Sequence, residues 1–153
     1  TASLISSCCA CGATSVGASE EITGQMKKFG EYVGISFQIK DDLFDFEMGN
    51  RTGKPNGIDI KEQKMTLPLI YMLSQLGPVE KRRTIRTIKN HHDDPARVAE
   101  IIDQVNHSGG ISYARSKMLE YRQKALDMLQ TMPDNESRQA MEKLVMYTTE
   151  RNK

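Results

Sequence analysis

Three carboxylates lie within five residues in the stretch Asp41-Asp42-Leu43-Phe44-Asp45, and the residues that flank this stretch are largely apolar. Moving a carboxylate out of water is costly unless a cation or hydrogen-bond donors compensate its charge. Any fold of this chain must therefore provide such a partner for these side chains. A divalent metal ion is the partner that we expect.

A long helix is predicted around this stretch, from about residue 19 to about residue 48. Ser19 can cap its first turn, and Glu20 and Glu21 have the charge that the helix dipole favours there. One side of the helix is broadly apolar and should pack against neighbouring elements. Its apolar residues are Phe29, Tyr32, Ile39, Leu43 and Phe46.

The acidic residues are expected on another face of the same helix. At about 100° per residue, Asp41 and Asp45 share one face, Gln38 lies one turn before Asp41, and Asp42 points to the side. Three polar side chains therefore converge, which is typical of a ligand-binding face. An acidic cluster near the end of a helix can also be a solvated surface, and spacing alone leaves this alternative open.

Two glycines on the same arc predict a cavity. Gly30 and Gly34 each cost about 1 kcal/mol of helix stability relative to alanine, so we expect that a ligand needs the space that they leave. Phe37 lies close to this arc. We expect a largely apolar cavity with carboxylates at its mouth, which suits a ligand with a charged head and a hydrocarbon tail.

The expected metal and ligand follow from the residue types. Carboxylate oxygens favour a hard cation such as Mg²⁺, which commonly bridges one or two carboxylates and substrate phosphates. The segment after the helix contains Lys54 and Lys64, which could neutralise further phosphate oxygens, and Gly53 would let this loop approach closely. A phosphate or diphosphate head group is therefore expected.

The rest of the chain also has helical periodicity, and no segment requires a strand. The uncharged residues 1–16 predict a buried, closely packed helix, and residues 49–65 have loop composition. Thr66 should cap a short helix that ends near residue 77. Further helices are predicted at about residues 78–90, 95–107, 110–131 and 135–151. The fold class is all-α, with about seven helices in a single domain over residues 1–153.

The composition limits which partners and which cellular location we expect. The 21 basic and 20 acidic residues give a net charge of +1, so no global charge favours nucleic acid or an anionic membrane, and any anion site must be local. Cys8, Cys9 and Cys11 fit neither a zinc site nor a disulfide framework and are expected to be packed small residues. No apolar run is long enough to span a bilayer and no signal peptide is recognisable, so we expect a cytoplasmic protein.

Three segments in sequence order resemble landmarks of the trans-prenyltransferases, the polyprenyl diphosphate synthase family. Residues 34–46, GISFQIKDDLFDF, resemble the second aspartate-rich motif of that family. Residues 53–60, GKPNGIDI, and residues 64–70, KMTLPLI, resemble the two segments that follow it. The resemblance implies that the chain is the C-terminal half of an isoprenoid-synthase-type helical bundle.

The resemblance also implies roles for individual residues. Asp41 would be the direct Mg²⁺ ligand, with Asp42 and Asp45 completing the metal site through water or through contacts with other groups. Asp41, Lys54 and Lys64 would be the catalytic residues. The residues that would bind the allylic diphosphate are Thr1, Gln38, Lys54 and Lys64.

The activity implied is the Mg²⁺-dependent head-to-tail condensation of isopentenyl diphosphate with an allylic diphosphate, in an enzyme that is a homodimer when intact. No first aspartate-rich motif occurs in the 153 residues, and the chain starts at Thr1 rather than at a methionine. We therefore expect a fragment that alone is inactive or nearly so. The length of the product cannot be read from this part of the protein, although the space expected beside Gly30 and Gly34 favours a long-chain product.

Three other functions fit parts of the sequence. A non-catalytic partner subunit of a prenyl synthase would keep the fold, but its aspartate motif is usually degraded, whereas the motif here is intact. A terpene-cyclase-like lyase also uses aspartate-rich helices, but the segments with Lys54 and Lys64 favour elongation. A helical interaction module with an incidental acidic cluster would show no metal-dependent binding of diphosphate.

Overall fold

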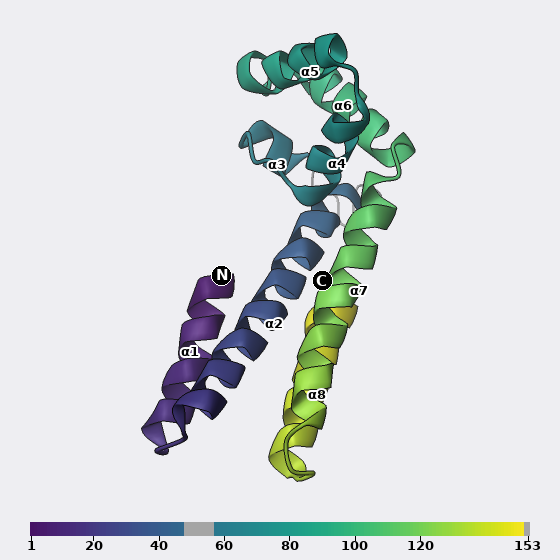
Figure 1. Ribbon diagram of the computed structural model, residues 1–153. Helices are drawn as coiled ribbons and strands as arrows, with labels where there is room; N and C mark the ends of the chain where they lie inside the picture. Colours follow the sequence, from purple (N-terminus) through teal and green to yellow (C-terminus); the bar gives the residue numbers. More distant parts are fainter. Residues whose placement is uncertain (48–56, 152–153) are drawn as a thin grey trace. The chain divides into compact units, whose positions relative to one another are not determined.

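The computed structural model describes residues 1–47 and 57–151, and these residues form eight α-helices and no strand (Figure 1). The predicted all-α fold class is confirmed. The helices are α1 (Ala2–Ser15), α2 (Glu20–Glu47), α3 (Ile58–Lys61), α4 (Leu67–Gln75), α5 (Pro78–Asn90), α6 (Pro95–His107), α7 (Gly110–Gln130) and α8 (Glu136–Glu150). None of the described helices is long and apolar enough to cross a membrane.

Local sequence signals set most helix boundaries. The Ser19 hydroxyl accepts a hydrogen bond from the backbone N–H of Ile22 at 3.3 Å, which confirms the predicted cap of α2. Helices α5 and α6 begin at Pro78 and Pro95, where a missing N–H costs nothing. The side chain of Asp94 caps α6 by accepting from the N–H of Ala96 at 2.9 Å. The predicted bounds of these two helices are confirmed.

The chain divides into two compact units. The first unit comprises residues 1–40 and 117–153, and the second comprises residues 41–116. Helices α2 and α7 each contribute to both units. That the 153 residues form one domain stays a prediction, and the two units are described separately below.

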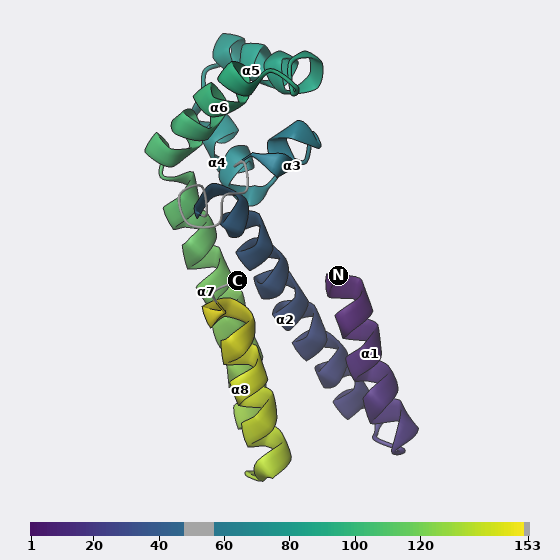
Figure 2. The same ribbon diagram turned by 180° about the vertical axis from the view of Figure 1, so that it is seen from behind.

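In the first unit, α1 runs beside α2 and α8 runs beside α7 in both views (Figures 1 and 2). Buried hydroxyls join the helices, because Ser6 Oγ donates to the carbonyl of Lys27 at 2.7 Å and Ser36 Oγ donates to the carbonyl of Met118 at 3.0 Å. The buried apolar residues of this unit include Phe29, Val33, Ala125, Leu129 and Val145.

Helix α1 was predicted correctly, but the prediction that it is buried is wrong. Ser6 is its one buried residue, Leu4 is 68 % exposed, and Cys8 and Cys11 are exposed as well. All three cysteines are free thiols. The reason is that α1 packs against α2 along one side, so small residues cover that side and the other side faces outward.

In the second unit, α4 packs against α5 and α6 around an apolar core. Gly57 precedes α3 with φ of +81°, and a Cβ atom there would lie 2.7 Å from Cγ1 of Val98, so glycine is needed for both conformation and space. Helix α6 contributes three residues to this core at helical spacing. The core consists of Phe46, Ile60, Leu69, Met72, Leu73, Ile88, Val98, Ile101 and Val105.

Candidate functional site

The carboxylate of Asp45, near the end of α2, holds the start of α3. Its Oδ1 accepts a hydrogen bond from the N–H of Ile58 at 3.0 Å, and its Oδ2 accepts one from the N–H of Asp59 at 3.2 Å. The first N–H groups of a helix have no partner within the helix, and an anion is favoured at that end. Backbone donors therefore provide part of the compensation that the sequence requires for this carboxylate.

The surroundings of Asp45 favour its protonated form. Burial raises the pKa of the Asp45 carboxyl above its ordinary value of 3.8, and the nearby carboxylate of Asp59 raises it further. The N–H groups of Asp59, Ile58 and Gly57 oppose this rise, because they stabilise the ionised form. A cation near this carboxylate would add to what these donors supply.

Asp59 connects Asp45 to Lys64. Its backbone N–H donates to Asp45, and its Oδ1 accepts a hydrogen bond from Nζ of Lys64 at 3.2 Å. Lys64 Nζ also lies 2.6 Å from Oε2 of Glu62. The hydrogen bonds with Glu62 and Asp59 raise the pKa of the Lys64 ammonium, so it stays charged at neutral pH.

A tight turn places Lys64 next to Asp59. Its N–H donates to the carbonyl of Asp59 at 2.8 Å, and the N–H of Gln63 donates to the carbonyl of Ile60 at 3.0 Å. Gln63 has φ of +57°, a left-handed conformation that non-glycine residues rarely adopt. Sequence reasoning assigned no role to Asp59 or Gln63, although Asp59 lies in the segment 53–60 that resembles a family landmark.

Thr66 stands at the N-cap position of α4, as predicted, but its side chain makes no capping hydrogen bond. The residue is 4 % exposed, and among the described residues its Oγ1 has no hydrogen-bond partner. The prediction that this hydroxyl caps the helix is therefore wrong.

The acidic residues do not assemble a complete metal site on their own. Asp41 and Asp42 lie on α2 in the second unit, as does Asp45. Within residues 1–47 and 57–151, no group of three or more His, Cys, Asp or Glu side chains could hold a metal ion. Any ion bound by these carboxylates therefore needs ligands from a substrate, from water or from elsewhere.

Further predicted site residues are Thr1, Phe37, Gln38 and Lys54. Lys54 falls outside the described residues, and Thr1 and Gln38 belong to the first unit. Phe37 is in the first unit as well, and the guanidinium of Arg151 lies 4.2 Å from the centre of its ring. Its predicted contact with a prenyl tail stays a prediction.

The open space expected beside Gly30 and Gly34 is not there. A Cβ atom on Gly30 would lie 2.7 Å from the carbonyl oxygen of Ile5, and one on Gly34 would lie 2.5 Å from Cα of Ala2. The glycines thus let the backbone of α1 approach α2. The prediction that they leave a cavity for a hydrocarbon tail is wrong, because α1 fills that space.

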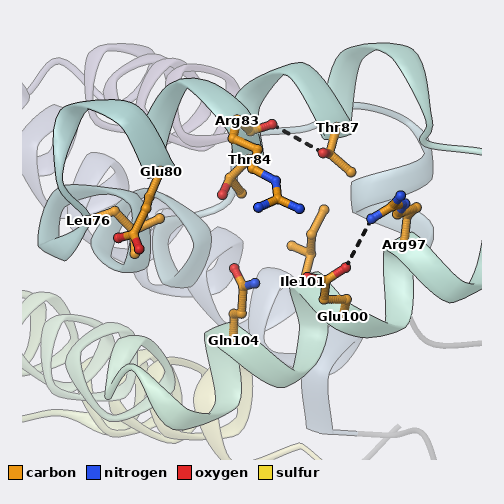
Figure 3. Close-up of a pocket in the computed structure, with 9 residues that line it drawn as sticks. All are labelled: Leu76, Glu80, Arg83, Thr84, Thr87, Arg97, Glu100, Ile101 and Gln104. Carbon is orange, nitrogen blue, oxygen red and sulfur yellow. Dashed lines mark hydrogen bonds and ion pairs between the residues drawn. The ribbon is translucent and has the colours of Figure 1, made fainter.

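A cleft of about 180 Å³ lies between α5 and α6, and none of the predicted site residues that the structure describes lines it (Figure 3). Arg83 extends from α5 into this cleft, where Arg97 of α6 pairs with Glu100 at 3.5 Å. Thr84, Thr87 and Gln104 supply further polar groups to its walls.

The sequence of the chain is similar to that of known prenyl diphosphate synthases. The sequence pattern of the polyprenyl synthetases matches residues 1–105. Heptaprenyl diphosphate synthase component 2 of Geobacillus stearothermophilus is 35 % identical over 153 residues, covering 99 % of this chain and 47 % of that protein. Nonaprenyl diphosphate synthase of Mycobacterium tuberculosis is 33 % identical, with 99 % of this chain and 45 % of that protein covered.

Solved structures agree with this result. Geranylgeranyl pyrophosphate synthase from Bacteroides thetaiotaomicron superimposes with a TM-score of 0.90 at 34 % identity, over 99 % of this chain and 50 % of that one. The synthase from Corynebacterium glutamicum, complexed with calcium and isoprenyl diphosphate, gives 0.81 at 31 % identity over 97 % and 46 %. The chain thus spans about half the length of these relatives. Because the family pattern covers more than half of its residues and the fold agrees, the chain belongs to the polyprenyl synthetase family.

Proposed function

We propose that this chain forms one side of the active site of a polyprenyl diphosphate synthase. The enzyme would condense isopentenyl diphosphate with an allylic diphosphate, head to tail, in a Mg²⁺-dependent reaction. The observation that carries the proposal is the link through Asp59, which hydrogen-bonds both Asp45 and Lys64. Acidic and basic groups suited to a metal and a diphosphate are thereby held within one compact unit.

The carboxylates fit a Mg²⁺ ion that is held jointly by the protein and the substrate. Mg²⁺ is commonly held by one or two carboxylates together with substrate phosphates and water, so three protein ligands are not required. Asp41 and Asp42 would hold the ion, while Asp45, whose two oxygens accept backbone N–H groups, would position the end of α2. When bound, Mg²⁺ would stabilise the negative charge that develops on the departing diphosphate. The relative solved with calcium and isoprenyl diphosphate supports a divalent cation and a prenyl diphosphate as the ligands.

Lys64 would bind the diphosphate of the allylic substrate. An ammonium group has three donors, and Asp59 and Glu62 occupy two directions around Nζ at 3.2 Å and 2.6 Å. The third donor can meet a phosphate oxygen without loss of the contact that positions the lysine. Gln38, Lys54 and Thr1 would provide further polar contacts to the diphosphate.

The proposal extends to the oligomeric state, the location and the product of the intact enzyme. We infer that the intact enzyme is a homodimer in the cytoplasm. We favour a long-chain product because the relatives include heptaprenyl and nonaprenyl diphosphate synthases. Apolar side chains on α1 and directly after it are exposed, Leu4 by 68 % and Val16 by 81 %. Such exposed apolar residues support contact of this helix with a partner subunit. We also expect the 153 residues alone to be inactive or nearly so, because the sequence has no first aspartate-rich motif.

Binding of a diphosphate by the purified chain tests the site. Calorimetric titration with an allylic diphosphate, with and without Mg²⁺, should show that Asp41→Asn lowers the Mg²⁺-dependent affinity about ten-fold or more. Asp93→Asn is a matched control, because Asp93 is an exposed carboxylate in the turn before α6. Unchanged Mg²⁺-dependent affinity in Asp41→Asn would contradict the proposal.

A further inference from the structure

Helix α5 concentrates positive charge on a chain whose overall net charge is small. It contains five basic residues and one acidic residue, Glu80, and thus has a net charge of +4, whereas the whole chain has +1. The basic residues are Lys81, Arg82, Arg83, Arg86 and Lys89. All five are exposed.

These five basic side chains form no ion pair within the described part of the chain. No carboxylate among residues 1–47 and 57–151 forms an ion pair with any of the five side chains. The cations of α7 behave differently, because Lys117 and Lys124 both pair with Glu120 at 2.7 Å. Helix α5 therefore keeps a positive field that internal pairs do not cancel.

Three of the cations form a continuous stripe. Arg82, Arg86 and Lys89 are spaced i, i+4 and i+7, so they follow one another along a single side of the helix. The core-facing side is marked by Ile88, which is 2 % exposed. Val79, three residues before Arg82, lies at the start of the stripe and is 81 % exposed. We call Val79, Arg82, Arg86 and Lys89 the basic stripe.

We propose that the basic stripe docks the protein onto an anionic phospholipid surface. Clusters of four to eight basic residues on an amphipathic helix are attracted to acidic lipid head groups. Arg83 lies beside the stripe and extends toward the α5–α6 cleft, where its guanidinium has no carboxylate partner within the described residues (Figure 3). It adds one more positive charge to the helix that carries the stripe.

Lipid fits the basic stripe better than nucleic acid does. Helix α5 contains no aromatic residue on which a base could stack. The exposed Val79 suits the boundary between head groups and acyl chains. The proposed function gives a further reason, on which this part of the argument rests: a long prenyl product is apolar, and a bilayer is its natural acceptor.

Vesicle sedimentation with the full chain tests the proposal. At about 0.1 M salt, the protein should sediment with vesicles made of equal parts phosphatidylglycerol and phosphatidylcholine, and should stay in solution with pure phosphatidylcholine. At about 1 M salt, where charges are screened beyond about 3 Å, binding should be lost. Equal binding to both vesicle types would overturn the proposal.

Neutralising the stripe should weaken this binding. Each basic residue near an anionic surface strengthens association roughly five-fold, so Arg82→Gln with Arg86→Gln should lower the partition coefficient roughly 25-fold. Glutamine is a good helix former, and neither arginine has a partner in the described part of the chain, so the variant should fold with an unchanged circular dichroism spectrum. Native-like vesicle binding by this variant would contradict the proposal.

Two controls separate the possible origins of the effect. Lys27→Gln with Lys143→Gln removes the same charge from exposed positions on α2 and α8 and should leave vesicle binding within about two-fold, since neither belongs to the stripe. Asp41→Asn should bind vesicles like the native chain, so a failure of the lipid proposal is distinguishable from a failure of the proposed catalytic site. Tighter binding to duplex DNA than to the acidic vesicles, lost in the Arg82 and Arg86 variant, would assign the stripe to nucleic acid and overturn the lipid proposal.

Discussion

Asp45 accepts a hydrogen bond from the backbone N–H of Asp59 at 3.2 Å, across a separation of 14 residues. The contact joins the end of α2 to the first turn of α3. The Asp45 carboxylate thus has a structural role, because it holds the first turn of α3. The side chain of Asp59 then connects the acidic stretch to Lys64. Substitutions at these positions separate structural roles from binding roles.

Removal of the Asp45 carboxylate should destabilise the second unit. In Asp45→Ala the N–H groups of Ile58 and Asp59 lose their acceptor, and loss of an N-cap costs about 1 kcal/mol of unfolding free energy. Asp45→Asn retains one acceptor oxygen and should lose less. Urea unfolding followed by circular dichroism gives both values. Equal stability of the native chain and Asp45→Ala would show that these hydrogen bonds contribute nothing.

The raised pKa of Asp45 predicts a pH dependence of known sign. The folded state binds this proton more tightly than the unfolded state does, so the stabilising effect of protonation is complete below the ordinary pKa of 3.8. It is lost as the pH rises through the folded-state pKa. Asp45→Asn has no such proton, and its unfolding free energy relative to the native chain should therefore increase with pH above about 3.8. Parallel stability curves would contradict the assignment.

The two glycine positions Gly34 and Gly24 of α2 should respond to alanine in opposite directions. A Cβ atom on Gly34 would lie 2.5 Å from Cα of Ala2, so Gly34→Ala should push α1 away and cost about 1–3 kcal/mol. A Cβ atom on Gly24 would meet nothing within 4 Å, so Gly24→Ala should stabilise the helix by up to about 1 kcal/mol. Thermal unfolding of both variants measures the difference. A stabilised Gly34→Ala would refute the close contact.

Lys64 should matter for binding more than for stability. Its ion pairs with Asp59 and Glu62 involve a half-exposed side chain, and such solvent-exposed pairs contribute little to stability. Lys64→Gln should therefore unfold almost like the native chain but bind an allylic diphosphate about ten-fold more weakly, because a charge-assisted hydrogen bond is lost. Lys61→Gln, at the end of α3, is the matched control. Equal losses of affinity in both variants would indicate a general charge effect.

The helices were predictable wherever their signals are local. Pro78 and Pro95 mark the starts of α5 and α6, and Ser19 and Asp94 cap α2 and α6 with their own side chains. Helix α3 was not predicted. Its four residues are too few for an apolar period to be visible, and the carboxylate that caps it lies 13 residues before Ile58.

The sequence by itself determined an all-α chain, the bounds of α5 and α6 and a family resemblance in residues 34–70, because periodicity, caps and motifs are local properties. Only the tertiary structure decided what surrounds each face. A helical wheel shows that Gly30 and Gly34 leave space, but the backbone of α1 fills it. The wheel also places Asp45 beside Asp41, yet the long-range contact with α3 determines what the Asp45 carboxylate binds.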